Sequence, residues 1–164
     1  MSGQDASTLR DLRLAALSDR PDAFGSTYDR EVAFAEGVWR QRAAESSSGD
    51  GAATFIAWSG DTPIGLVGGF RADDGASQVV ELVSMWTGPA ARRSGVGRHL
   101  VEAVLAWARS TTADRVELWV TRGNDAAQRL YESIGFVVTG DHQPLPSDPC
   151  RDEVRMAMAL VDDD

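Results

Sequence analysis

Residues 91–100 (ARRSGVGRHL) combine two glycines, three arginines and the start of an apolar stretch with helical spacing. Glycine lets the backbone approach a ligand closely, which Gly95 and Gly97 would allow here. The unpaired N–H groups at the start of the following helix are donors for an anion. The pattern is therefore suited to binding a pyrophosphate, whether its arginines add charge-assisted contacts or stay solvated.

This turn differs from two common phosphate-binding loops. No Gly-Lys-Ser/Thr follows the glycines, which excludes a Walker loop, and Leu100 occupies the place of the third glycine in the dinucleotide fingerprint. A Gly-x-Gly turn is weak evidence by itself, so its place among the secondary-structure elements decides its meaning.

The elements predicted around the turn alternate between strands and helices. A strand candidate at 78–86 precedes it, and the apolar residues of 96–107 recur at helical spacing after it. The segments that follow, in the order strand, helix, strand and strand, are 115–121, 124–134, 136–140 and 153–160. Residues 141–152, between the last two strands, read as a proline-rich loop.

The first part of the chain predicts two helices and a hairpin. Leu9, Leu12, Ala16 and Leu17 have helical spacing in a segment that Pro21 ends, and 29–44 read as a second helix interrupted by Gly37. Two apolar runs within 53–70 are joined by the turn residues SGDT, which is typical of a β-hairpin. The whole pattern predicts an α/β fold, with antiparallel strands early and a β-α-β-α-β run late.

Composition narrows the class of protein. The 164 residues, 43% of them hydrophobic, predict a single domain over 1–164 with a substantial core. A lone cysteine, Cys150, and a polar start without a signal peptide predict a reduced, cytoplasmic protein. The formal charge of −9 argues against nucleic acid, no segment is long enough to span a membrane, and His99 and His142 lack a cluster that could bind metal.

Two longer motifs resemble those of the GCN5-related N-acetyltransferase (GNAT) family. The stretch MWTGPAARRSGVGRHL, 85–100, is similar to the family's central Arg-x-x-Gly-x-Gly/Ala motif, and NDAAQRLYESIGF, 124–136, is similar to its second signature. The resemblance implies a mixed, mostly antiparallel central sheet that is splayed at the cofactor site and flanked by helices. The family's first strand normally precedes the first helix, so either the sheet starts at 53–58 or the chain start is truncated.

The resemblance also implies that acetyl-CoA is the co-substrate. The backbone of Met85, Trp86 and Thr87 would pair with the pantetheine arm. The turn would hold the pyrophosphate through the backbone N–H groups of Arg92, Arg93, Ser94, Gly95, Val96, Gly97 and Arg98. Asn124 would touch the cofactor arm or cap the next helix, and these two roles are compatible.

Tyr131 and Glu81 are the candidate catalytic residues. In the family the matching tyrosine protonates the departing thiolate, although the helical stripe that includes Tyr131 also allows a core position. Glu81 is a carboxylate among apolar residues of a strand, and in the histone acetyltransferase branch a glutamate at this distance from the turn is the base. The alternative for Glu81 is an edge or surface position paired with an arginine.

The acceptor site would be built from the segments around 21–31 and 141–152. Candidate lining residues are Phe24, Tyr28, Glu31 and Asp148, each of which could instead be ordinary loop or core. Trp119 stands where ribosomal-protein alanine acetyltransferases carry a glutamate, which disfavours that specificity. Cys150 has no paired histidine pattern, which favours direct transfer over a covalent acyl-enzyme.

The sequence thus predicts an N-acetyltransferase that moves an acetyl group from acetyl-CoA to a primary amine of a small molecule or peptide. The alternative is a non-catalytic acyl-CoA-binding regulatory module. Neither the acceptor nor the acyl-chain preference follows from the sequence, and a homodimer formed through a strand edge is compatible with it.

Overall fold

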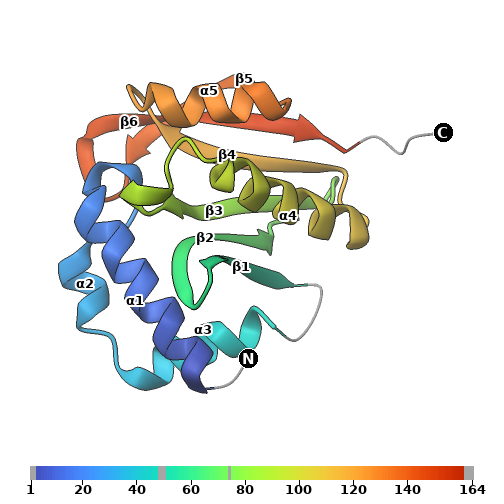
Figure 1. Ribbon diagram of the computed structural model, residues 1–164. Coiled ribbons are helices and arrows are strands. Elements are labelled where there is room, and N and C mark those ends of the chain that lie inside the picture. The colour runs from blue at the N-terminus through green and yellow to red at the C-terminus, as the bar shows by residue number, and fades with distance from the viewer. Residues whose placement is uncertain (1–2, 48–50, 74, 161–164) are drawn as a thin grey trace.

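A computed structural model describes residues 3–47, 51–73 and 75–160 (Figure 1). The chain forms one six-stranded sheet with helices on both faces. In chain order the elements are α1 (Gly3–Asp19), η1 (Pro21–Ala23), α2 (Tyr28–Val32), α3 (Glu36–Glu45), β1 (Ala52–Ser59), β2 (Thr62–Arg71), β3 (Val79–Thr87), η2 (Pro89–Ala91), α4 (Val96–Ser110), β4 (Arg115–Thr121), α5 (Asp125–Ile134), β5 (Val137–Leu145) and β6 (Asp148–Ala159).

The sheet is mixed and mostly antiparallel, as predicted. Its strand order is β1-β2-β3-β4-β6-β5, and β3 and β4 are its parallel neighbours. These two strands pair only where Val79–Glu81 faces Arg115–Glu117, and beyond that point they separate. Ser84 lies just past the separation with a φ of 58°, where the register between β2 and β3 shifts. A bulge of this kind bends the strand, so the predicted splay is confirmed.

Two apolar clusters hold the helices to the two faces of the sheet. Val101 and Val104 of α4 are fully buried against Val80 and Val116 of the central strands, and α5 packs beside them. On the other face α1 and α3 form a second cluster, in which Trp39 is 2% exposed. Figure 1 shows α1, α2 and α3 on one side of the sheet and α4 and α5 on the other.

Two details differ from the sequence prediction. The second predicted helix is two helices, which break at residues 33–35, and Gly37 lies inside the first turn of α3. Residues 141–152 are mostly strand, because β5 and β6 form a hairpin whose turn is 146–147. Proline is tolerated in β5 because an edge strand has one row of backbone groups without a partner strand. Within the described residues the first strand is β1, which follows three helices.

Candidate active site

A cavity of about 710 Å³ opens where β3 and β4 separate. Its wall is formed by the glycine-containing turn before α4, the two separating strands, α5 and the segment after α1. The lining residues are Arg20, Ala23, Phe24, Leu82, Val83, Ser84, Met85, Trp86, Thr87, Ala91, Arg92, Arg93, Gly95, Gly97, Arg98, Trp119, Val120, Thr121, Asn124, Ala126, Ala127, Arg129, Leu130 and Tyr131. The structure therefore brings most of the predicted cofactor residues together; Ser94 and Val96 lie in the same turn outside the lining.

The turn before α4 has the backbone geometry that its glycines allow. Gly95 caps α4 with a φ of 86°, in the left-handed region where a side chain would be strained. A Cβ on Gly97 would lie 3.1 Å from Met85 Cε and 3.2 Å from Leu130 Cδ2, so this backbone packs closely on β3 and α5. The N–H groups at the start of α4 thus lie at the cavity wall without side chains of bulk between them and a ligand.

The charge of the cavity wall is positive. Five arginines line it, and no Asp or Glu is among the lining residues in the described part of the chain. Arg98 donates to Ser133 Oγ at 2.8 Å, and Arg92 pairs with Asp19. A wall of this sign favours an anionic ligand such as a phosphate ester.

Tyr131 lies on α5 with 6% of its surface exposed. Its ring packs edge-on against Phe136 with 5.8 Å between centroids, and its hydroxyl forms no hydrogen bond with any described group. Burial raises the pKa of the phenol above its ordinary value, so the hydroxyl stays protonated at neutral pH. Tyr131 therefore belongs to the core and also lines the cavity, and its catalytic role stays a prediction.

Asn124 caps α5 and also lines the cavity. Its Oδ1 accepts a hydrogen bond from the Ala127 N–H at 3.4 Å. The capping role is thereby present, and the position of the amide at the cavity wall leaves room for the second role predicted from the motif.

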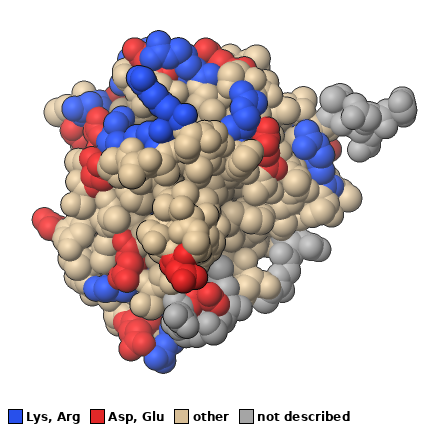
Figure 2. All heavy atoms as spheres, in the orientation of Figure 1, with Lys and Arg blue, Asp and Glu red and all other residues tan. Residues whose placement is uncertain are grey.

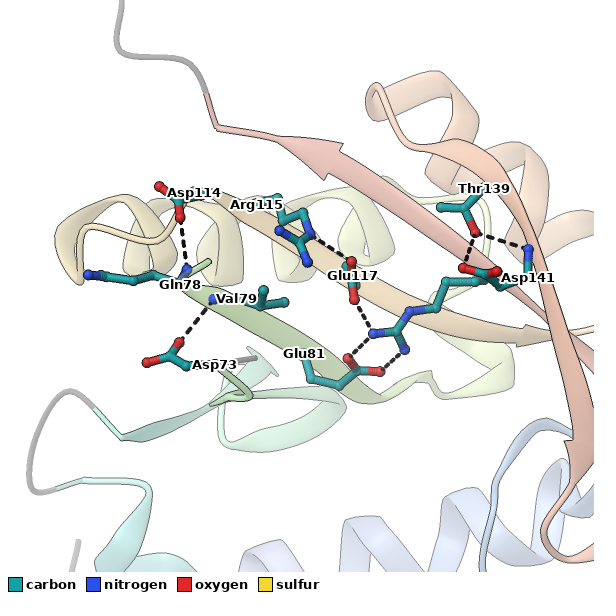
Figure 3. A network of polar contacts seen from close by, with 10 residues as sticks. Asp73, Gln78, Val79, Glu81, Asp114, Arg115, Glu117, Thr139 and Asp141 are labelled. Carbon is teal, nitrogen blue, oxygen red and sulfur yellow. Dashed lines mark hydrogen bonds and ion pairs between the residues drawn. The ribbon is translucent and has the colours of Figure 1, made fainter. Parts of the chain in front are cut away.

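Glu81 lies at the last residue pair before β3 and β4 separate, and it is 8% exposed. Arg155 donates to both of its oxygens, at 2.8 and 2.9 Å, and to Glu117 as well (Figure 3). Burial raises the pKa of Glu81 and outweighs the opposite effect of Arg155. Glu81 is paired with an arginine and lies outside the cavity lining. The same Arg155 stacks at 4.7 Å on the ring of Trp119, which does line the cavity.

Of the four candidate acceptor residues, Phe24 alone lines the cavity among the residues described. Glu31 is 1% exposed and lies between Arg13 and Arg42, with bonds of 3.0 and 2.9 Å. Tyr28 is exposed, and Asp148 pairs with Arg151 at 3.4 Å on β6. Glu31 on α2 thus links α1 and α3 through these two arginines. Tyr28 and Asp148 lie outside the cavity lining.

Several wall residues were not predicted as site residues. Trp119 and Thr121 line the cavity because they lie beyond the splay, two residues apart on the same face of β4. The sequence shows that Trp119 and Thr121 lie on the same face of a strand. It does not show where β3 and β4 separate. Ser84 owes its place to the bulge, for which the sequence has no signal.

A metal centre and a membrane-spanning helix are both absent from the described residues. No group of three or more His, Cys, Asp or Glu side chains there could hold a metal ion. No helix in that part is long and apolar enough to cross a membrane.

The known proteins that this chain resembles include acetyltransferases. Residues 13–136 match the family model described as Acetyltransferase (GNAT) family. A mycothiol acetyltransferase from Thermobispora bispora is 41% identical over 66 residues, which are 40% of this chain and 22% of that protein. The chain spans less than a third of the length of the curated relatives it matches.

Solved structures share the fold over nearly the whole chain. A GNAT-family acetyltransferase from Streptococcus pneumoniae superposes with a TM-score of 0.83 at 21% identity, covering 98% of this chain and 96% of that one. A Salmonella typhimurium protein solved with its cofactor acetyl-CoA gives 0.73 at 19% identity, covering 100% and 93%. The fold, the motifs and the family model agree, and the chain belongs to the GNAT acetyltransferase family.

Proposed function

We propose that the protein transfers an acetyl group from acetyl-CoA directly to a primary amine of a small molecule or a peptide. The observation that carries the proposal is the cavity between β3 and β4, because it brings the anion-binding turn and Tyr131 to one space. Family membership supports the same activity.

The residues of the cavity fit acetyl-CoA in shape and charge. The backbone of Met85, Trp86 and Thr87 faces the gap left by β4 and can pair with the amides of an extended arm. The turn from Arg92 to Arg98 can hold the pyrophosphate on N–H groups and guanidinium charge. Asn124 lies across the gap from the strand.

Acetyl-CoA supplies a thioester, whose carbonyl carbon is attacked by a neutral amine. The C–S bond then breaks, and the sulfur leaves as a thiolate. Tyr131 donates its proton to that sulfur, and the proton that the attacking nitrogen loses as the amide forms restores the phenol through solvent. The raised pKa of Tyr131 keeps the proton available at neutral pH, and no competing hydrogen bond from a described group holds it.

The acceptor must reach the thioester as a free amine, because an ammonium has no lone pair. Glu81 takes up this proton through water, because its carboxylate lies outside the cavity lining. Its raised pKa brings it nearer to neutral pH, where a base is most effective.

The acceptor carries few positive charges besides the reacting amine. Phe24 and Trp119 offer aromatic surface, whereas five arginines and no carboxylate line the described wall. Polyamines should therefore be poor acceptors, while amino acids, peptide ends and mycothiol-related amines belong in the test panel.

Substitution of Tyr131 by Phe tests the proposal against the non-catalytic module. Thiol release from acetyl-CoA is measured across the panel of amines, with a blank that corrects for Cys150. We expect Tyr131→Phe to lower kcat about 100-fold or more, the usual contribution of a general acid, with CoA affinity unchanged. A wild-type protein that binds acetyl-CoA but releases thiol with none of the acceptors, or a variant with wild-type kcat, would contradict the proposed roles.

A further inference from the structure

Asp19, the last residue of α1, is bonded to two residues of the cofactor wall. Its Oδ2 accepts a hydrogen bond from Trp86 Nε1 at 3.0 Å and pairs with the guanidinium of Arg92. Both bonds lower the pKa of Asp19, so its carboxylate is charged at neutral pH. The pair is partly exposed, with 27% of the Asp19 side chain and 36% of the Arg92 side chain accessible. A ligand in the cavity can therefore compete for it.

The segment 20–24, which we call the strap, continues from Asp19 across the mouth of the gap. Three of its residues line the cavity: Arg20, Ala23 and Phe24. Thr121 Oγ1 on β4 donates to the Asp22 carbonyl at 2.7 Å, and Ser147 Oγ on the β5–β6 turn donates to the carbonyl of Phe24. The strap is thus fixed to β4 and the β5–β6 turn at one end and, through Asp19, to β3 and the turn before α4 at the other.

Asp19 and a bound pyrophosphate require the same guanidinium. Arg92 lines the cavity at the start of the turn proposed to hold the pyrophosphate, and its guanidinium is paired with Asp19. A pyrophosphate carries more negative charge than one carboxylate and is the stronger partner for a guanidinium. Binding of the phosphates then removes one of the two bonds that hold the α1 end of the strap.

We propose that Asp19 is a positioning residue that couples the two substrates: pyrophosphate binding draws Arg92 from Asp19, which loosens the strap and admits the acceptor after acetyl-CoA. The inference rests on the proposed function. By linkage, the cost of breaking the pair is part of the binding free energy of CoA, so removing the pair in advance strengthens CoA binding.

The test is the affinity for CoA itself, measured by titration calorimetry on the whole chain. In Asp19→Asn the amide oxygen still accepts from Trp86, but the charge that holds Arg92 is gone. We expect CoA to bind about two- to fivefold more tightly, the effect of one exposed ion pair. Asp11→Asn, on the same helix and paired with Arg10 at 3.5 Å, is the matched control and should bind CoA like the wild type.

A second readout concerns the order of binding. In the wild type the KM of an acceptor from the panel should fall as acetyl-CoA approaches saturation, and in Asp19→Asn this dependence should disappear. Asp19→Ser, which removes both bonds, should change CoA affinity in the same direction and serves if the first variant folds poorly. Unchanged or weaker CoA binding by the variants would overturn the coupling, whereas a wild type that fails to bind CoA would overturn the proposed function as well.

Discussion

Glu81 poses the sharpest question at the scale of single residues, because its surroundings combine two opposite effects. Burial disfavours its charge and raises its pKa, while Arg155 holds the charged form in a two-bond pair. Arg155 is shared with Glu117, which is itself bonded to Arg115. Because Arg155 is shared, it stabilises the charged form of Glu81 less than it would in an isolated pair. This is compatible with Glu81 taking up a proton.

Glu81→Gln distinguishes a base from a structural ion pair. If Glu81 is the base, kcat at neutral pH should fall about 100-fold, and the loss should shrink as the pH rises toward the pKa of the amine, which then loses its proton unaided. In the wild type the rate should fall on the acid side at a pH above the ordinary carboxyl range, because the pKa of Glu81 is raised. The pH–rate profile is the measurement.

Glu117→Gln is the matched control, since it removes the other carboxylate on Arg155. It should cost stability and keep the pH-dependent rate, but move the acid side of the profile to lower pH, because Glu117 no longer raises the pKa of Glu81 by its charge or shares Arg155. A Glu81→Gln variant whose activity is lowered by one factor at every pH would leave Glu81 a purely structural role.

At the scale of elements, two glycines at the same helical position give a direct comparison. Gly37 is the second residue of α3 and Gly97 the second residue of α4. Nothing lies within 4 Å of a Cβ on Gly37, whereas a Cβ on Gly97 would meet Met85 and Leu130 at 3.1 and 3.2 Å. Replacing glycine by alanine favours the helix equally at both sites. The difference between the two changes in free energy of unfolding therefore measures the close packing of α4.

We expect Gly37→Ala to raise the free energy of unfolding by about 0.5 kcal/mol and Gly97→Ala to lower it by about 1 kcal/mol. Urea unfolding of the two variants is the measurement. Equal gains in both would mean that Met85 and Leu130 move aside at no cost, and that α4 is not fixed against β3 by this contact.

The elements that the sequence predicted well are those whose signals are local. α4 and α5 have clear apolar stripes, and α5 ends at Gly135 as expected. The β5–β6 hairpin was missed because Pro144 and Pro149 suggest a loop, and an edge position that tolerates proline depends on the whole sheet.

The candidate site divides in the same way. The turn and Tyr131 follow from contiguous motifs, so the sequence is sufficient to place them. Ser84 lines the cavity because of a bulge, and Asp19, at a helix end, bonds Trp86 of the wall; both positions depend on tertiary packing. Phe24 was found, but Glu31 was drawn into an ion pair with Arg13 that no local pattern indicates.

On the scale of the whole molecule, charge is distributed unevenly. The formal charge is −9, yet arginines line the cavity. Figure 2 shows basic side chains gathered on the upper part of the face, where Figure 1 places α5 and the start of α4. An anionic substrate is thus repelled by the molecule at long range and attracted by the wall at short range.

CoA affinity should accordingly fall as salt is added, because the guanidinium contacts of the cavity wall are screened. Arg129→Ala removes one exposed cation of the wall and should weaken both the affinity and its salt dependence. Arg109→Ala, at the last turn of α4 and outside the described lining, is the control. Titrations at several NaCl concentrations provide the measurement, and a slope that is the same in Arg129→Ala and wild type would exclude this residue from phosphate binding.

The short pairing of β3 with β4 gives the molecule two sheet edges in its interior. Edge strands normally lie at the periphery, where any extended chain can add to them. Here the strap and α5 border the two edges, so only a chain that is narrow, extended and equipped with amides can complete the sheet. In the binding mode proposed above, the ligand is selected by the same backbone complementarity that adds a strand, and folded neighbours are kept away from the unpaired groups.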